Sequence, residues 1–421
     1  MPSSTRWSRL AAALLGATWL FHAWRAATAA LTTDEAFTAL HFVAKPWLEV
    51  MTTFDANHHV LHTLLCKLSV GALGWSELAL RLPALLGTAV LFVSLWRLLR
   101  RAVGETALLA AGCLLVAWWP ELSDFLSLAR GYSLALGFFT AGLIDAWDER
   151  YQRMSVLFGL AVASNLILAA PVTAAVIALT VARGLWRRFD ELAGPGAVVS
   201  FVVVSLPLSR ATAANFYFGA AGWRNSLETM LHVPGPEWWS GTAIFAVPAA
   251  MLWAAWRQRD WLAGTFVLSV AAVIGPHLLL ATPWPSGRTG LHLVLLGLVL
   301  VVSAARAWRW SAALLALAGL WCAANVDPRG YREWMFDSEQ REVLAAIVAY
   351  NPKAQVMCTS PLDTALEYYM KVRQVQAPPP VAYRAEGLAD VYVLQESVDR
   401  PPRGARLLAR FAKSGVALYA R

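Results

Sequence analysis

The sequence predicts an all-α polytopic membrane protein with about eleven transmembrane helices and a small extracytoplasmic α/β domain at the C-terminus. Of its 421 residues, 58% are hydrophobic and only 15% are charged, and the mean hydropathy is +0.50. Soluble domains carry about one quarter charged residues. Apolar runs that approach the roughly 20 residues needed to cross a bilayer recur along the chain. Arginine clusters occupy the short connections between these runs, as in cytoplasmic loops.

The arginines also predict the topology. Arg6 and Arg9 precede the first span (10–31), so we expect a cytoplasmic N-terminus and a first exit to the outer side. This run also fits a cleaved signal peptide, but its length and the spans that follow favour a retained anchor. The next spans are predicted at 82–99, 103–119, 126–146, 154–169, 172–186 and 195–209, and four more precede Asn325.

The net charge of +8 does not indicate nucleic-acid binding, because the arginines lie in the short loops between spans. The four cysteines show no metal-ligand spacing, and three of them lie in apolar segments, so a disulfide framework is not expected. Residues 58–74 are apolar but short and carry three histidines and a lysine. A full crossing there would place every later arginine cluster outside, so we predict an amphipathic helix on the outer surface.

The composition changes after Asp327, which divides the chain into a membrane module (1–326) and a small domain (327–421). Helices are expected at Ser338–Tyr350, with Ser338 as the N-cap, and at Leu362–Met370. Strands are expected at 354–359, 389–395 and 416–420.

Two adjacent carboxylates, Asp34 and Glu35, directly follow the first span. Acids are costly near hydrocarbon and often mark a functional site, although a hydrated helix end explains them equally well. Arg130 and Arg288 border apolar spans on the same predicted face. Each either extends to the interface or binds an anion, and a pair on one face favours an anion such as phosphate.

Several segments together resemble the GT-C glycosyltransferases, which use polyprenyl-phosphate sugars. The resemblance is to the branch with protein O-mannosyltransferases, the aminoarabinose transferase of lipid A and the rhizobial lipopolysaccharide core transferases. It covers about residues 10–150 well and 280–300 plausibly. The matching segments are, in order, Asp34-Glu35, His58-His59-Val60-Leu61-His62, Glu77–Pro83, Ala129-Arg130-Gly131-Tyr132, and Pro285–Leu291.

The resemblance implies a transferase that moves a hexosyl or pentosyl group from a polyprenyl-phosphate donor to a lipid, polysaccharide or protein acceptor. It implies that Asp34 is the base and that Arg288 contacts the donor phosphate, with Arg130 and His58 as further phosphate ligands. Glu35 either orients the acceptor or caps a helix. Val60 departs from the family motif, which usually has proline there. The family's second acid is missing beside Arg130, and Asp124 is the candidate to replace it.

No cofactor is predicted with certainty; a divalent metal ion stays open, but the sequence offers no ligand pattern that supports one. The composition indicates a bacterial inner membrane with a periplasmic active face. Two other functions stay open: a transporter or flippase of a lipid-linked sugar, and a non-catalytic scaffold. A transporter predicts charges near mid-span, whereas here the polar groups collect on one face. A scaffold leaves the Asp34 loop unexplained.

Overall fold

The structure is a computed structural model, and it describes residues 4–212, 215, 219–383 and 388–421. The chain forms two compact units. The first combines residues 1–23, 51–65 and 82–326, and the second combines 24–50, 66–81 and 327–421. The unit boundaries cut through four helices (Ser4–Thr28, Trp47–Thr52, Val60–Leu73 and Glu77–Val103). The C-terminal region shares its unit with the segment that carries Asp34 and Glu35.

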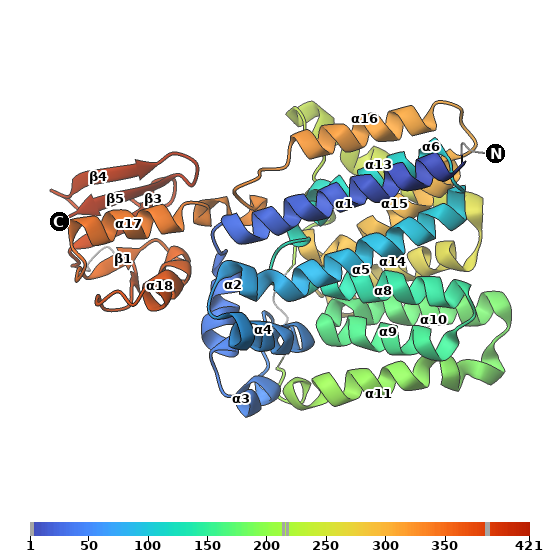
Figure 1. The fold of residues 1–421 in the computed structure, drawn as a ribbon, viewed down its shortest axis with the longest axis horizontal. Coiled ribbons are helices and arrows are strands. Elements are labelled where there is room, and N and C mark those ends of the chain that lie inside the picture. The colour runs from blue at the N-terminus through green and yellow to red at the C-terminus, as the bar shows by residue number, and fades with distance from the viewer. Residues whose placement is uncertain (1–3, 213–214, 216–218, 384–387) are drawn as a thin grey trace. The chain divides into compact units, whose positions relative to one another are not determined.

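Each predicted span corresponds to one helix of the described chain (Figure 1). Within the described residues, five segments are long and apolar enough to cross a bilayer: 77–103, 166–183, 186–208, 261–280 and 287–305. The side of the bilayer on which each loop lies stays a prediction. The helices are α1 (Ser4–Thr28), α5 (Glu77–Val103), α6 (Ala107–Trp118), α8 (Tyr132–Trp147), α9 (Tyr151–Ser164), α10 (Ala169–Arg183), α11 (Phe189–Leu208), α13 (Glu237–Gln258), α14 (Trp261–Leu280), α15 (Leu291–Ala305) and α16 (Ser311–Ala324).

Small residues let the helices of the first unit approach closely. Helix α9 packs against α8 and α11, α10 against α14, and α6 against α16. A Cβ added at Gly159 would lie 2.5 Å from the carbonyl oxygen of Gly196, and one at Gly87 would lie 2.4 Å from the Cα of Leu134. Such glycine contacts are typical of helices that associate in lipid, where backbone packing replaces the hydrophobic effect.

Short elements connect these helices. The predicted fourth span was wrong at its start: Pro120 begins the separate helix α7 (Pro120–Phe125), and α8 begins only at Tyr132. Helix α4 (Val60–Leu73) is the helix predicted at 58–74, and its 14 residues are short for a crossing. Its place on the outer surface stays a prediction. The others are α2 (Thr33–Thr38), the π-helix η1 (Ala39–Val43), α3 (Trp47–Thr52), α12 (Trp223–Leu231), and the 3-10 helices η2 (Leu166–Leu168), η3 (Trp186–Arg188), η5 (Gly287–Gly290) and η6 (Arg332–Asp337).

The C-terminal region contains a five-stranded mixed sheet with helices, which confirms the predicted α/β fold there. The division into domains at residue 327 stays a prediction. The strand order is β2-β1-β3-β5-β4, in which β1 pairs parallel with β2 and β3, and β5 pairs antiparallel with β3 and β4. Its elements are α17 (Gln340–Tyr350), β1 (Val356–Cys358), α18 (Leu362–Val372), β2 (Val381–Ala382), β3 (Val391–Gln395), β4 (Arg406–Phe411) and β5 (Val416–Ala420).

The predicted N-cap at Ser338 is wrong. Ser338 itself has helical backbone angles because it closes η6, and Glu339 occupies the N-cap position of α17 without a side-chain cap bond. The Glu339 carboxylate instead accepts hydrogen bonds from the Ser414 backbone N–H (2.8 Å) and hydroxyl (2.9 Å), which ties α17 to the end of the sheet.

Candidate functional site

A cavity of about 310 Å³ in the first unit brings together polar residues from five separate parts of the chain. They come from the loop before α4, the start of α8, the connection between α9 and η2, residue 215 between α11 and α12, and η5. These polar lining residues are Asp55, Asn57, His58, His59, Arg130, Tyr132, Asn165, Asn215, Arg288 and Thr289.

Local hydrogen bonds fix the loop that carries His58. The Asp55 carboxylate accepts from the backbone N–H of Asn57 (2.7 Å), and the Asp55 carbonyl accepts from the N–H of His58 (3.0 Å). The ring Nδ1 of His58 lies 3.0 Å from the carbonyl oxygen of Thr53. This contact turns the Nε2 edge of the ring away from its own loop, so the imidazole has a defined orientation at the cavity wall.

Arg130 is almost completely buried and is held by the same loop. Its Nη2 donates to the side-chain oxygen of Asn57 (2.8 Å), and its Nη1 approaches the Asn57 carbonyl at 3.5 Å. Gly131 follows in the left-handed region (φ 70°), and a Cβ there would lie 2.6 Å from the Ser164 carbonyl oxygen. Only glycine fits this turn, which aims Arg130 before α8 begins.

Arg288 enters the cavity from the 3-10 turn η5. Ser286 and Thr289 form a capping box that closes this turn, and Gly287 has a positive φ of 44°. The Thr229 hydroxyl accepts from the Gly287 backbone N–H at 3.1 Å, and so ties η5 to α12. Arg288 is therefore carried by a rigid turn rather than by an unconstrained loop.

The histidines at the cavity are kept neutral. Burial lowers the pKa of His58, and burial together with the positive charge of Arg130 lowers the pKa of His59 well below its ordinary value. Arg288 acts on the pKa of His59 in the same direction. Two guanidinium groups thus supply the positive charge of this cavity, and uncharged imidazoles surround them. Such a site favours an anion, because guanidinium donates paired hydrogen bonds to phosphate or carboxylate oxygens.

A second cavity, of about 300 Å³, is almost wholly apolar. Side chains of α12, α13 and α14 line it, and so do Trp284 and Pro285, which directly precede the Arg288 turn. The Ser226 hydroxyl donates to the Pro285 carbonyl (2.6 Å), which fixes this segment against α12. One short segment, 284–289, therefore contributes to both the apolar and the cationic cavity.

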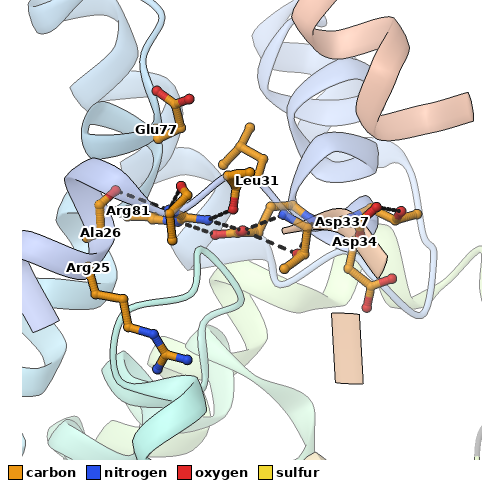
Figure 2. Close-up of polar contacts among 12 residues, drawn as sticks. Arg25, Ala26, Leu31, Asp34, Glu77, Arg81 and Asp337 are labelled. Atoms are coloured by element: carbon orange, nitrogen blue, oxygen red, sulfur yellow. Dashed lines mark hydrogen bonds and ion pairs between the residues drawn. The ribbon is translucent and has the colours of Figure 1, made fainter. Parts of the chain in front are cut away.

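Glu35 lies in the second unit, in a buried cluster centred on Arg81 (Figure 2). The Glu35 carboxylate accepts from Arg81 Nε (2.8 Å) and Nη2 (2.6 Å), and neither side chain is exposed. The same carboxylate accepts from the Thr32 backbone N–H (2.9 Å) and completes a capping box at the start of α2. Of the two roles left open for Glu35, the helix cap is confirmed.

Asp34 lies within this capped first turn and is half-buried, and in Figure 2 its carboxylate points away from Arg81. Asp337 holds the preceding residue, because its carboxylate accepts from the backbone N–H (2.6 Å) and the hydroxyl (3.1 Å) of Thr33. Burial, with a contribution from the negative charge of Asp34, raises the pKa of Asp337 to about 7. The Tyr369 hydroxyl accepts from the Leu31 N–H at 2.8 Å. The C-terminal region thus fixes the backbone on which Asp34 stands.

The structure brings together three of the residues predicted from the sequence, His58, Arg130 and Arg288. Asp124 is buried on α7, which packs against η5, but it is not among the described residues that line the cavity. Asp34 and Glu35 belong to the other unit, and their roles in chemistry stay predictions.

Asn57 and Asn165 were not assigned to the site from the sequence. The signal for Asn165 was its position, a lone amide in the turn between two apolar helices, and it was too weak to identify a function. In the described part of the chain, no group of three His, Cys, Asp or Glu side chains is arranged to hold a metal ion.

No protein-family model and no curated protein matches the sequence, but several solved structures match the fold. ArnT from Cupriavidus metallidurans bound to undecaprenyl phosphate has a TM-score of 0.56 at 14% identity, and its apo state has 0.61 at 15%. In both comparisons the match covers 99% of this chain and 98% of ArnT. The arabinofuranosyltransferase AftD from Mycobacteria (mutant R1389S) has a TM-score of 0.54 at 12% identity, covering 98% of this chain and 41% of AftD. This chain therefore has the fold of ArnT over nearly its full length, and the fold of a part of AftD, as expected from the sequence.

Proposed function

We propose that this chain is an integral-membrane glycosyltransferase that moves a sugar from a polyprenyl-phosphate donor to an acceptor hydroxyl on a lipid, a polysaccharide or a protein. The observation that carries the proposal is the cavity where Arg130 and Arg288 meet beside neutral histidines. ArnT, which shares the fold, binds undecaprenyl phosphate. A lipid phosphate is the anion that this pair of arginines suits within a membrane protein.

The apolar cavity beside the Arg288 segment supports the same donor. An isoprenoid chain needs a hydrocarbon-lined path that begins next to its phosphate, and segment 284–289 borders both cavities. A nucleotide-sugar donor has no apolar chain to fill such a space. We assign the isoprenoid part of the donor to the cavity lined by α12, α13 and α14.

In the proposed reaction, the acceptor oxygen forms a bond to the anomeric carbon as the bond from that carbon to the phosphate oxygen breaks. The bonding electron pair leaves with polyprenyl phosphate, and the acceptor proton passes to the Asp34 carboxylate. Arg288 and Arg130 stabilise the charge on the departing phosphate. His58 joins them as a phosphate ligand in its protonated form, because its Nδ1–H donates to the Thr53 carbonyl and its neutral Nε2 can only accept. Asp124, on the helix that packs against η5, stays the candidate for the second acid. The active face is proposed to be periplasmic, in a bacterial inner membrane.

The test compares a deletion strain with strains complemented by the wild type, Asp34→Asn and Glu49→Gln. Mass spectrometry of lipid-linked and envelope glycans should show a missing sugar in the deletion strain. D34N should leave it missing, because loss of a general base costs about 10² to 10⁴ in rate. E49Q is the matched control, since Glu49 is an exposed acid of the same segment. Full restoration by D34N contradicts the assignment of the base, and unchanged glycans in the deletion strain contradict the transferase.

A further inference from the structure

Two further cavities of the first unit meet at Trp96 and Arg97 on α5. One, of about 350 Å³, is an apolar groove between α1 and α5. The other, of about 650 Å³, lies between the last turns of α5 and the turn that follows α8. Trp96 and Arg97 line both cavities, so the apolar groove leads into the polar cavity.

The apolar groove lies between α1 and α5, and the two helices contact each other next to it. Trp19 on α1 donates from its indole Nε1 to the Leu85 carbonyl on α5 (3.0 Å), and the two helices run alongside each other (Figure 1). Gly16 opens the groove, because a Cβ added there would meet nothing within 4 Å. Apart from Arg97 at one end, aliphatic and aromatic side chains line it, including Leu15, Phe92 and Val93. Such a lining accommodates a hydrocarbon chain.

The polar cavity carries an excess of positive charge. Four arginines line it (Arg97, Arg100, Arg101 and Arg150) against one lining acid, Asp148. Asp148 pairs with Arg101, and Glu105, which lies outside the lining, pairs with Arg100. The guanidinium of Arg100 also lies 5.1 Å from the centre of the Trp96 ring. Arg150 lies 3.7 Å from Asp145, a third acid outside the lining, and 3.9 Å from Asp148. Three acids for four arginines still leave a net positive charge at the cavity, which favours an anionic group.

We propose that the groove and the cavity together bind one anionic phospholipid, with an acyl chain along α1 and α5 and the phosphate headgroup among the four arginines. Charge complementarity selects an anionic headgroup over a zwitterionic one, and the adjoining apolar groove selects a lipid over a soluble phosphate. None of the residues that line these two cavities lines the cationic cavity of Arg130 and Arg288, so the lipid does not compete with the proposed sugar donor. The inference does not depend on the proposed function.

The experiment measures lipid binding to the full chain, purified in detergent, by native mass spectrometry. The probes are phosphatidylglycerol, phosphatidylcholine with identical acyl chains, and glycerol phosphate as the headgroup without a tail. Phosphatidylglycerol should bind at least about tenfold more tightly than phosphatidylcholine. The double variant Arg97→Gln/Arg100→Gln should abolish that preference. Arg257→Gln is the matched control, because Arg257 is an exposed arginine in the last turn of another long helix, α13, and should keep it.

A second pair of variants tests the groove without changing charge. Gly16→Phe places a ring in the groove and should weaken phosphatidylglycerol binding about tenfold. Gly71→Phe is the control, since a Cβ at Gly71 also meets nothing within 4 Å but lines neither cavity. If the arginine double variant does not fold, the glycine pair decides.

Several results would overturn the proposal. Equal binding of the two phospholipids would mean that headgroup charge is not recognised, and displacement of phosphatidylglycerol by glycerol phosphate would mean that a phosphate alone is the ligand. If Arg257→Gln lost the preference for phosphatidylglycerol as fully as the double variant, the preference would come from the overall surface charge and not from this cavity. If Gly16→Phe bound phosphatidylglycerol as tightly as the wild type, the groove between α1 and α5 would not be the site of the acyl chain.

Discussion

Arg81 in the second unit and Arg288 in the first are both arginines of an apolar protein, but their surroundings differ. Arg81 donates to the Glu35 carboxylate and to the carbonyl oxygens of Ala26, Ala29 and Ala30, so all five of its N–H groups have protein acceptors. Arg288 is only half-buried and lines an open cavity together with Arg130. An arginine whose donors are all used by buried groups of its own protein serves the fold, and one that lines a cavity can contact a ligand there.

The largest effect expected from this comparison is on folding. Arg81→Gln leaves Glu35 as a buried carboxylate without its cation and removes the hydrogen-bond donor of three backbone carbonyls. The loss should destabilise the protein by about 3–5 kcal/mol. Thermal unfolding of the detergent-purified protein measures the loss. Arg341→Gln is the control, because Arg341 also donates to backbone carbonyls of this segment (Thr28 and Ala29, both 3.0 Å) but is partly exposed. The comparison fails if both variants unfold at the same temperature.

Asp337 should make the second unit sensitive to pH. Its pKa of about 7 lies above the ordinary 3.8, so the folded state favours the protonated carboxyl. The stabilisation is complete below about pH 4 and is lost as the pH rises through 7, by about 4 kcal/mol at most. Asp337→Asn should flatten this dependence in thermal unfolding measured from pH 5 to 8. Asp390→Asn is the control, since Asp390 also accepts a backbone N–H (Gln355, 2.8 Å), and it should keep the wild-type slope.

Arg288→Gln should affect turnover and leave folding unchanged. Removing one cation from the departing phosphate should lower the rate of sugar transfer about a hundredfold, or about 3 kcal/mol. The unfolding temperature should stay at the wild-type value, in contrast to Arg81→Gln. The rate is measured as transfer in membranes from the complemented deletion strain. Arg224→Gln is the control, because Arg224 is exposed on α12 and pairs only with Glu228 among the contacts described for it. A fall in unfolding temperature as large as that of Arg81→Gln would make Arg288 a structural residue.

The sequence predicted the helical elements better than their connections, for physical reasons. Eleven apolar runs became eleven helices of the described chain, because length and hydropathy are local properties. The start of α8 was predicted too early, since the apolar residues around Leu126 and Leu128 continue the run although the backbone leaves the helix. Strand β4 was missed because Arg406–Phe411 is an edge strand, partly exposed and without clear alternation.

The residues of the candidate site were also predicted where a local sequence feature marks them, and were missed where only the tertiary structure does. Arg130 and Arg288 were found because charges beside apolar spans are conspicuous and the family motifs include them. The partner of Glu35 was not identified, since Arg81 lies 46 residues away and only the fold pairs them. Asn57 and Asn165 carry no charge, and their importance arises from what the tertiary structure places beside them.

Asn165 gives the smallest of the expected effects and the finest test of the cationic cavity. Its side-chain oxygen accepts from the Ile167 backbone N–H (3.2 Å), and this bond leaves the amide nitrogen for another partner at the cavity that Asn165 lines. That nitrogen is buried and makes no hydrogen bond to any residue that the structure describes. A buried donor without an acceptor is costly, so a ligand oxygen is expected to accept from it.

Asn165→Ser keeps an oxygen for the turn but removes the amide N–H group. It should lower kcat/KM for the polyprenyl-phosphate sugar about tenfold, or about 1.4 kcal/mol. Asn351→Ser is the matched control, because Asn351 makes the same turn bond, to the Lys353 N–H (3.0 Å), outside the cavity. If the amide meets the sugar, Asn165→Ser should bind undecaprenyl phosphate, which has no sugar, as well as the wild type does. If the amide contacts the phosphate, Asn165→Ser should also bind undecaprenyl phosphate about tenfold more weakly than the wild type does. Equal activity of Asn165→Ser, Asn351→Ser and the wild type would show that the buried Asn165 amide plays no part in recognising the polyprenyl-phosphate sugar.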